Sequence, residues 1–422
     1  MSNIINLDWQ TNKEYFLANS ESQLAYVLLE IKPQLSAKSA RQPLNLGLVL
    51  DRSGSMKGEK IENVRQAVCK IIDQLNETDI LSVVIFNDEV ELLIPSQPVA
   101  DKEYLKNIVN QLVHRGGTTI SKGMRVGLDE ISSHLDESRI NRMILLTDGQ
   151  TYGDEDECCI LAQEAAAQNI AVTALGVGDE WNDEMVDAIA KYSQGKSDYI
   201  ESPDDIIKYF SDEVATFQDT VIQRALLTLR LTEGTTPRRI FRIIPLIADL
   251  GYAPISENDI IVELNDLTNK TGQKLLVELL LPPRPTGNFR LAQAELTFDV
   301  PSKNLFQQKL RVDLTFQFSK DPELTRNYNA DLMNTVERVT AFNLQTRALN
   351  DLAEGNLNEA TRRLRAAATR LLNLDEPELA QTALQEADNL EQQGHLSNRG
   401  TKKLRYETRK LTRRLEELDE VV

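Results

Sequence analysis

The chain has few of the side chains on which metalloenzymes and secreted domains depend. Its 422 residues include three cysteines and three histidines. An odd number of cysteines, two of them adjacent (Cys158 and Cys159), gives no disulfide framework and is typical of a reducing compartment. None of the histidines is paired at metal-ligand spacing, so we expect surface residues rather than general bases. These absences predict a cytoplasmic protein whose cysteines are buried apolar residues.

Long apolar runs and nucleotide-binding loops are also lacking. No run of about 18 apolar residues occurs, so we expect no transmembrane helix. Residues 1–10 lack the basic region and the apolar region of a signal peptide. There is no Gly-x-x-x-x-Gly-Lys loop for hydrolysing nucleotides. The net charge is −18, with most of the excess in residues 1–330. Such a surface repels phosphate backbones and anionic lipids, so neither nucleic acid nor a membrane is an expected partner.

The residues that are present predict several folded parts. A hydrophobic content of 41% and a charged content of 27% suit two or three globular domains. From 43 to 217, short apolar runs alternate with longer helical patterns, which indicates a parallel sheet with crossover helices. The strands are expected at 46–50, 80–86, 90–94, 143–146, 171–177 and 198–200, and the helices at 61–75, 104–112, 124–131, 160–167, 185–192 and 206–217.

The flanks of this region predict other folds. A single strand-like run, 23–31, precedes it, and the segments that follow have period-two alternation typical of an antiparallel sandwich. A lone strand is not stable by itself. We therefore expect residues 1–42 and 218–320 to form one β-sandwich into which the α/β domain, 43–217, is inserted. Helical stripes predict a C-terminal helical domain at 321–422. The later strands are expected at 225–231, 239–244, 260–264, 274–281, 292–298 and 308–318.

The most informative motif is Asp51-Arg52-Ser53-Gly54-Ser55, which follows the apolar run 46–50 and precedes a helical pattern. One carboxylate and two hydroxyls at a strand end can direct three oxygens at a small, hard cation. Two later segments, Gly116-Gly117-Thr118-Thr119 and Thr147-Asp148-Gly149, complete a set of five oxygens. All five are hard ligands without nitrogen or sulfur, which favours Mg²⁺, Mn²⁺ or Ca²⁺ over Zn²⁺ or Cu²⁺.

This order of motifs resembles the metal-ion-dependent adhesion site of the von Willebrand factor type A (VWA) family, over residues 43–217. The resemblance implies a doubly wound, mainly parallel α/β sheet of the Rossmann-like type. It implies the metal ligands Asp51, Ser53, Ser55, Thr118 and Asp148, with Thr119 as the alternative threonine. The β-rich flanks are similar to those of inter-alpha-trypsin inhibitor heavy chains.

Two charged segments have competing interpretations. The acids at 154–157 favour the first turn of a helix, where negative charge complements the helix dipole, over a second cation site. The basic residues between 399 and 414 favour a solvated helix face over a surface that binds nucleic acid or an acidic partner.

The resemblance predicts a non-enzymatic, metal-dependent interaction protein. With two carboxylates the charge of Mg²⁺ is only balanced, so an Asp or Glu of a protein partner is attracted to its open position. One alternative, which rests on family analogy, is an adaptor subunit of an AAA+ ATPase of the chelatase type. The other is a metal-dependent phosphoesterase, for which the chain lacks a two-metal carboxylate cluster.

Overall fold

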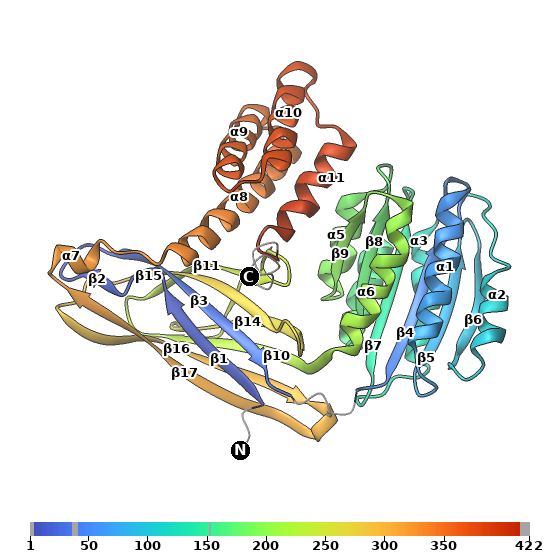
Figure 1. The fold of residues 1–422 in the computed structure, drawn as a ribbon, viewed down its shortest axis with the longest axis horizontal. Helices are drawn as coiled ribbons and strands as arrows, with labels where there is room; N and C mark the ends of the chain where they lie inside the picture. The colour runs from blue at the N-terminus through green and yellow to red at the C-terminus, as the bar shows by residue number, and fades with distance from the viewer. Residues whose placement is uncertain (1–3, 36–40, 152, 414–422) are drawn as a thin grey trace. The chain divides into compact units, whose positions relative to one another are not determined.

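The computed structural model describes residues 4–35, 41–151 and 153–413 (Figure 1). The chain divides into two compact units. One comprises residues 1–39 together with 221–422, and the other comprises residues 40–220. The α/β unit is thus inserted in the sequence of a unit that begins before it and resumes after it.

The inserted unit contains one six-stranded sheet with the order β6-β5-β4-β7-β8-β9. All neighbouring strands are parallel except β6, which runs antiparallel to β5. The chain moves from β4 outwards to β5 and β6, and then returns to β7 on the other side of β4. The reversal of strand order therefore lies between β4 and β7. The strands are β4 (Leu44–Asp51), β5 (Ile80–Phe86), β6 (Val90–Pro98), β7 (Ile140–Thr147), β8 (Ala171–Val177) and β9 (Lys196–Ile200).

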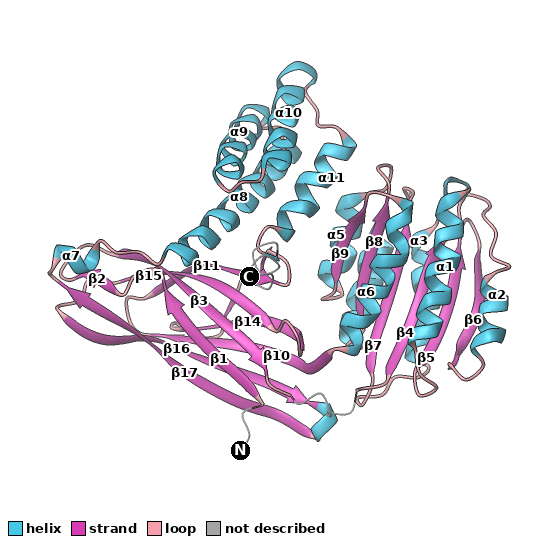
Figure 2. Cartoon of the chain, viewed as in Figure 1, coloured by secondary structure: helices cyan, strands magenta, loops and turns pink. Residues whose placement is uncertain are grey.

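Helices cover both faces of this sheet, as Figure 2 shows. Side chains of α1, α2 and α6 share one apolar core with the strands, while α3, α4 and α5 contact one another and the opposite face. Because both faces are covered, every residue of β4, β5 and β7 is buried, which explains their continuous apolar runs. The helices are α1 (Glu59–Gln74), α2 (Lys102–Val109), α3 (Ile120–Ser132), α4 (Glu155–Ala167), α5 (Asp183–Tyr192) and α6 (Ile206–Gln218).

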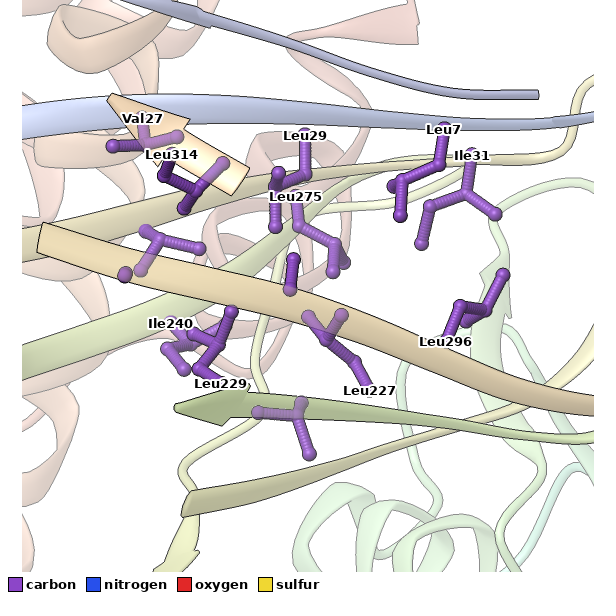
Figure 3. Close-up of a cluster of buried hydrophobic side chains, with 14 of the residues drawn as sticks. Leu7, Val27, Leu29, Ile31, Leu227, Leu229, Ile240, Leu275, Leu296 and Leu314 are labelled. Carbon is purple, nitrogen blue, oxygen red and sulfur yellow. The ribbon is translucent and has the colours of Figure 1, made fainter. Parts of the chain in front are cut away.

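The second unit is built on a sandwich of two sheets. Their orders are β1-β3-β15-β11-β12 and β13-β14-β10-β16-β17-β2. Leu29 and Leu275 from the first sheet meet Leu227 and Leu296 from the second in the apolar core (Figure 3). The strands are β1 (Ile5–Thr11), β2 (Tyr15–Leu17), β3 (Gln23–Pro33), β10 (Thr220–Leu231), β11 (Thr236–Ile244), β12 (Ala248–Asp249), β13 (Ala253–Pro254), β14 (Asp259–Thr268), β15 (Gln273–Leu281), β16 (Gly287–Val300) and β17 (Leu305–Ser319).

The sandwich confirms the expected fold class and corrects one detail. The strand predicted at 23–31 pairs with β15, as expected, over Gln23–Ile31 against residues 273–281. It is not the only strand before the α/β unit, because β1 pairs along its other edge and β2 runs parallel to the end of β17. Ile5, Leu7 and Trp9 alternate with polar residues along β1, so the sequence did contain the signal for this strand.

The C-terminal helices pack on the outer face of the first sheet. Phe241 and Leu276 from that sheet join Leu332 and Leu364 from the helices in one apolar cluster. The expected helix breaks near Gly355, 373–377 and Gly394 are present, and Gly394 adopts the left-handed conformation that ends a helix. The helices are α7 (Pro322–Thr325), α8 (Ala330–Ala353), α9 (Leu357–Asn373), α10 (Pro377–Gln393) and α11 (Asn398–Glu407).

The basic segment is only in part the solvated helix face that the sequence predicted, because Arg399 and Arg413 are exposed but other basic residues are partly or fully buried. Lys402 is 3% exposed and Leu404 is fully buried. The guanidinium of Arg409 lies 4.8 Å from the centre of the Tyr406 ring, and Lys410 pairs with Glu407. Packing of the apolar parts of these long side chains explains the difference. Position 414, the last of the basic run, lies outside the described residues.

One buried carboxylate in the sandwich, that of Glu295, forms ion pairs with three basic side chains. Glu295 on β16 pairs with Arg230 of β10 at 3.0 Å, with Lys309 of β17 at 3.7 Å, and also with Arg311. Its side chain is only 4% exposed. The hydrogen bond from Arg230, followed by that from Arg311, lowers the pKa of Glu295 to about 2. A carboxylate with a lowered pKa stabilises the fold above its unfolded pKa, and this contribution is lost as the pH falls towards 2.

We predict that Glu295→Gln lowers the free energy of unfolding by about 1–3 kcal/mol at pH 7. The difference in the free energy of unfolding between the variant and wild type should narrow as the pH falls below about 4.5. Glutamate in the unfolded wild type then takes up a proton before Glu295 in the folded protein does, which reduces the stabilisation that the carboxylate gives. Denaturant unfolding at pH 7 and pH 3.5 measures both effects. Asp313→Asn is the control, since Asp313 is half exposed and its pair with Arg290 should contribute less than about 1 kcal/mol. An equal loss at both pH values would contradict this account.

Candidate metal site

The first part of the site is the turn that follows β4. Asp51 is the last residue of this strand, and its Oδ1 accepts a hydrogen bond from the backbone N–H of Ser53 at 2.7 Å. This short-range bond folds the chain back immediately after the strand. A single 3₁₀ turn, Gly54–Met56, and Gly58 with a positive φ of 83° then lead into α1. The turn therefore places the two serines beside the carboxylate.

The second part comes from the end of β7, the strand next to β4. The register pairs Leu50 with Leu146, so the residues that follow meet at the same edge of the sheet. The hydroxyl of Thr147 donates to Asp51 Oδ2 at 2.7 Å. Asp148 Oδ1 accepts from Ser55 Oγ at 2.7 Å and lies 3.5 Å from Ser53 Oγ. This is the crevice at the carboxyl ends of strands where α/β sheets bind ligands.

The third part is the loop before α3. A β-carbon on Gly149 would lie 3.2 Å from Thr118 Oγ1 and 3.9 Å from Ser55 Oγ. Thr118 therefore reaches the Asp148 side of the cluster. Thr119 instead occupies the N-cap position of α3, and its N–H donates to the carbonyl of Asn87. The structure thus brings together the five predicted side chains and favours Thr118 over Thr119; their role as metal ligands stays a prediction.

Backbone hydrogen bonds join the loops around these side chains. The N–H of Gly54 donates to the carbonyl of Gly116 at 2.9 Å, and the N–H of Arg115 donates to the carbonyl of Arg52 at 2.7 Å. The N–H of Gly117 donates to Asp88 Oδ2 at 2.7 Å, and a β-carbon at Gly117 would lie 2.3 Å from Asp88 Oδ1. At Gly116 the positive φ of 78° favours glycine, whereas a side chain at Gly117 would displace the Asp88 carboxylate.

Sequence reasoning missed two groups that support the turn. The Arg52 side chain is 5% exposed, pairs with Glu91 at 2.7 Å and donates to Asn87 Oδ1 at 3.3 Å. The Arg52 side chain therefore holds the turn against β6 and the loop that follows β5. Thr147, which precedes Asp148, orients Asp51. Thr147 belongs to the Thr147-Asp148-Gly149 motif, but the sequence did not indicate that its hydroxyl contacts Asp51.

The acidic residues 154–157 contact or belong to the first turns of two helices, α3 and α4. Asp154 Oδ2 accepts from the N–H of Ser121 in the first turn of α3 at 2.8 Å. The other three acids lie in the first turn of α4, where Glu157 pairs with Arg125 at 3.2 Å. This agrees with the interpretation as a helix start. Within the described residues, no group of three or more His, Cys, Asp or Glu is arranged to hold a metal ion.

The electrostatics of the two aspartates differ. Asp51 is fully buried, and its hydrogen-bond partners among the described residues, Ser53 and Thr147, are neutral. Burial raises the pKa of Asp51 from its ordinary 3.8 to about 6, and the nearby charge of Asp148 adds to the rise. Asp148 is 1% exposed and forms an ion pair with Lys60 from the first turn of α1. Among the described residues, no cationic side chain forms an ion pair or hydrogen bond with the Asp51 carboxylate.

This donor set suits a hard divalent cation. The two carboxylates are buried, whereas Ser55 is exposed and Thr118 is half exposed, so the hydroxyl side is open to solvent. A cation among the five oxygens would offset the desolvation of Asp51 and replace the hydroxyl hydrogen bonds. The residues therefore fit Mg²⁺, Mn²⁺ or Ca²⁺ by both charge and ligand type.

Comparison with known proteins settles the family. The profile of the von Willebrand factor type A domain matches residues 45–212, and that of the Sll0103-like C-terminal alpha-helical domain matches residues 330–414. The uncharacterized protein sll0103 of Synechocystis sp. is 32% identical over 292 residues, covering 67% of this chain and 68% of that protein. The chain belongs to the von Willebrand factor type A family.

Other VWA proteins match less of their own length or only the fold. Human inter-alpha-trypsin inhibitor heavy chain H4 is 31% identical over 147 residues, which covers 32% of this chain and 16% of that protein. The structure of a von Willebrand factor type A protein from Catenulispora acidiphila has a TM-score of 0.74 at 17% identity, covering 97% of this chain and 98% of that one. The fold is thus shared along nearly the whole chain.

VWA domains typically act in protein–protein interaction, and they often bind a divalent metal at a metal-ion-dependent adhesion site. Throughout 4–35, 41–151 and 153–413, none of the helices has the combined length and apolarity that a bilayer crossing requires.

We predict that Asp51→Asn stabilises the metal-free protein by about 1–3 kcal/mol at pH 7. A carboxylate with a raised pKa destabilises the folded state above that pKa, and the substitution removes this charge. The Asn oxygen can still accept from Ser53, and its amide can donate to Thr147, whose hydroxyl can turn to the carbonyl of Gly149, 3.4 Å away. Chemical denaturation in the presence of a chelator measures the change.

Asp79→Asn is the matched control at the opposite end of the sheet. Asp79 is equally buried, but it pairs with Arg41 at 2.8 Å and accepts from the N–H groups of Leu44 and Asn76. Its replacement should destabilise the protein by about 1–3 kcal/mol. If both variants were destabilised alike, Asp51 would be an ordinary structural aspartate.

Proposed function

We propose that this protein is a non-enzymatic interaction protein whose partner binding depends on a divalent cation. Asp51, Ser53, Ser55, Thr118 and Asp148 would hold Mg²⁺, Mn²⁺ or Ca²⁺. The observation that carries the proposal is the pair of buried carboxylates beside three hydroxyls, closed on the protein side and open at Ser55. A buried carboxylate without a cationic partner destabilises the fold, so a purely structural role does not explain Asp51.

The arrangement also indicates the kind of partner. When bound, the cation supplies a coordination position for an oxygen from outside the protein, because five side chains do not complete an octahedral shell. The N-terminal end of α1 follows the turn, and its dipole favours an incoming anion. An Asp or Glu side chain of a protein partner has the required chemistry. The adaptor role towards an AAA+ ATPase rests on analogy alone, and the cytoplasmic location on the cysteine pattern; both stay predictions.

We predict one saturable site for Mg²⁺ or Mn²⁺ in calorimetric titration of the full chain. Asp51→Ala should abolish it, because it removes one of the two carboxylates. The control is Asp129→Ala, which removes an exposed carboxylate from α3 and should leave binding unchanged. Equal binding by Asp51→Ala and wild type would contradict the proposed site.

A further inference from the structure

A lysine forms part of the candidate site, although it lies outside the three motifs that supply the predicted ligands. Lys60 is the second residue of α1, and its Nζ forms an ion pair with Asp148 Oδ2. The other oxygen of Asp148, Oδ1, faces Ser55 at 2.7 Å. The two oxygens of one carboxylate are therefore divided between a fixed ammonium group and the hydroxyls that would surround a cation.

Local helix energetics do not explain this lysine. A positive side chain in the first turn of a helix is disfavoured by the helix dipole, and the other charged residues of this turn, Glu59 and Glu62, are acidic. The side chain of Lys60 is 26% exposed, whereas that of Asp148 is fully buried. The position of Lys60 is thus explained by its contact with Asp148.

Lys60 changes the charge of the site by one unit. Asp51, Asp148 and Lys60 together carry −1, so a bound divalent cation brings the total to +1. Without the lysine, the same site would change from −2 to zero. A site with a total of +1 repels a second cation and adds a long-range attraction for a carboxylate, whereas a neutral site attracts a carboxylate only through the open position on the cation.

We propose that Lys60 is a built-in counter-charge that weakens cation binding and strengthens binding of the partner's carboxylate to the loaded site. This inference rests on the proposed function, because it concerns the same five ligands. Lys60 does not touch the cation in this account. It acts through Asp148 and through its charge, which repels the cation and attracts the carboxylate of the partner.

Two substitutions separate charge from structure. Lys60→Met removes the charge and keeps the length of the side chain, and Lys60→Arg keeps the charge. We expect Lys60→Met to bind Mn²⁺ about 10-fold or more tightly than wild type, because a neighbouring positive charge is removed from a partly buried site. Acetate should bind to the Mn²⁺-saturated Lys60→Met protein several-fold more weakly. Lys60→Arg should behave like wild type in both titrations.

The melting temperature gives a second readout, and its value in a chelator does not depend on the affinity for the cation. In a chelator, Lys60→Met leaves the buried carboxylate of Asp148 without its ion pair, so its melting temperature should fall below that of wild type. Mn²⁺ should then raise the melting temperature of Lys60→Met more than that of wild type, because the cation replaces the missing charge.

The outcomes distinguish the two proposals. If wild type binds Mn²⁺ and Lys60→Met binds it equally or more weakly, Lys60 is only a structural partner of Asp148 and the inference fails while the proposed function stands. If wild type, Lys60→Met and Lys60→Arg all fail to bind Mn²⁺, the proposed function fails and the inference with it. Binding by Lys60→Met alone would contradict the saturable site that is predicted for wild type, and with it the proposal that Lys60 tunes a working site.

Discussion

The structure of the site depends on the burial of two carboxylates at the ends of adjacent central strands. Asp51 and Asp148 are both excluded from solvent, and like charges in such surroundings raise the energy of the ionised pair. The groups around them, the hydroxyls of Ser55 and Thr147 and the ammonium group of Lys60, partly satisfy these charges. A divalent cation would satisfy them more completely, which is the physical basis of the proposed function.

The rest of the inserted unit positions these two residues. Parallel pairing of β4 with β7 places both strand ends at one edge, and the reversal of strand order leaves that edge open between them. Three loops are then joined by backbone hydrogen bonds, so that Thr118 arrives at the cluster from a segment far along the chain. The ion pair between the buried Arg52 side chain and the half-exposed Glu91 joins the first of these loops to an edge strand. The ligands therefore come from a strand end and from loops that backbone hydrogen bonds join to one another.

Much of this arrangement could be predicted from the sequence. Strands buried on both faces have continuous apolar runs, so Ile80–Phe86 and Ala171–Val177 are predicted with their observed bounds. The motif order also predicts which oxygens meet. The sequence did not reveal Lys60, because its partner lies 88 residues away and the contact depends on how α1 starts. It also missed β1 and β2 and misjudged part of the basic C-terminal segment, where tertiary packing buries side chains that a linear pattern would expose.

The most direct test of the central claim is a crystal structure of the Mn²⁺-soaked protein, with anomalous scattering recorded at the manganese edge. The account predicts one strong anomalous peak within about 2.0–2.4 Å of oxygens from the turn after β4 and within one water of Asp148. A soak that leaves the carboxyl ends of β4 and β7 without a peak, or that places Mn²⁺ only elsewhere on the protein, would contradict it.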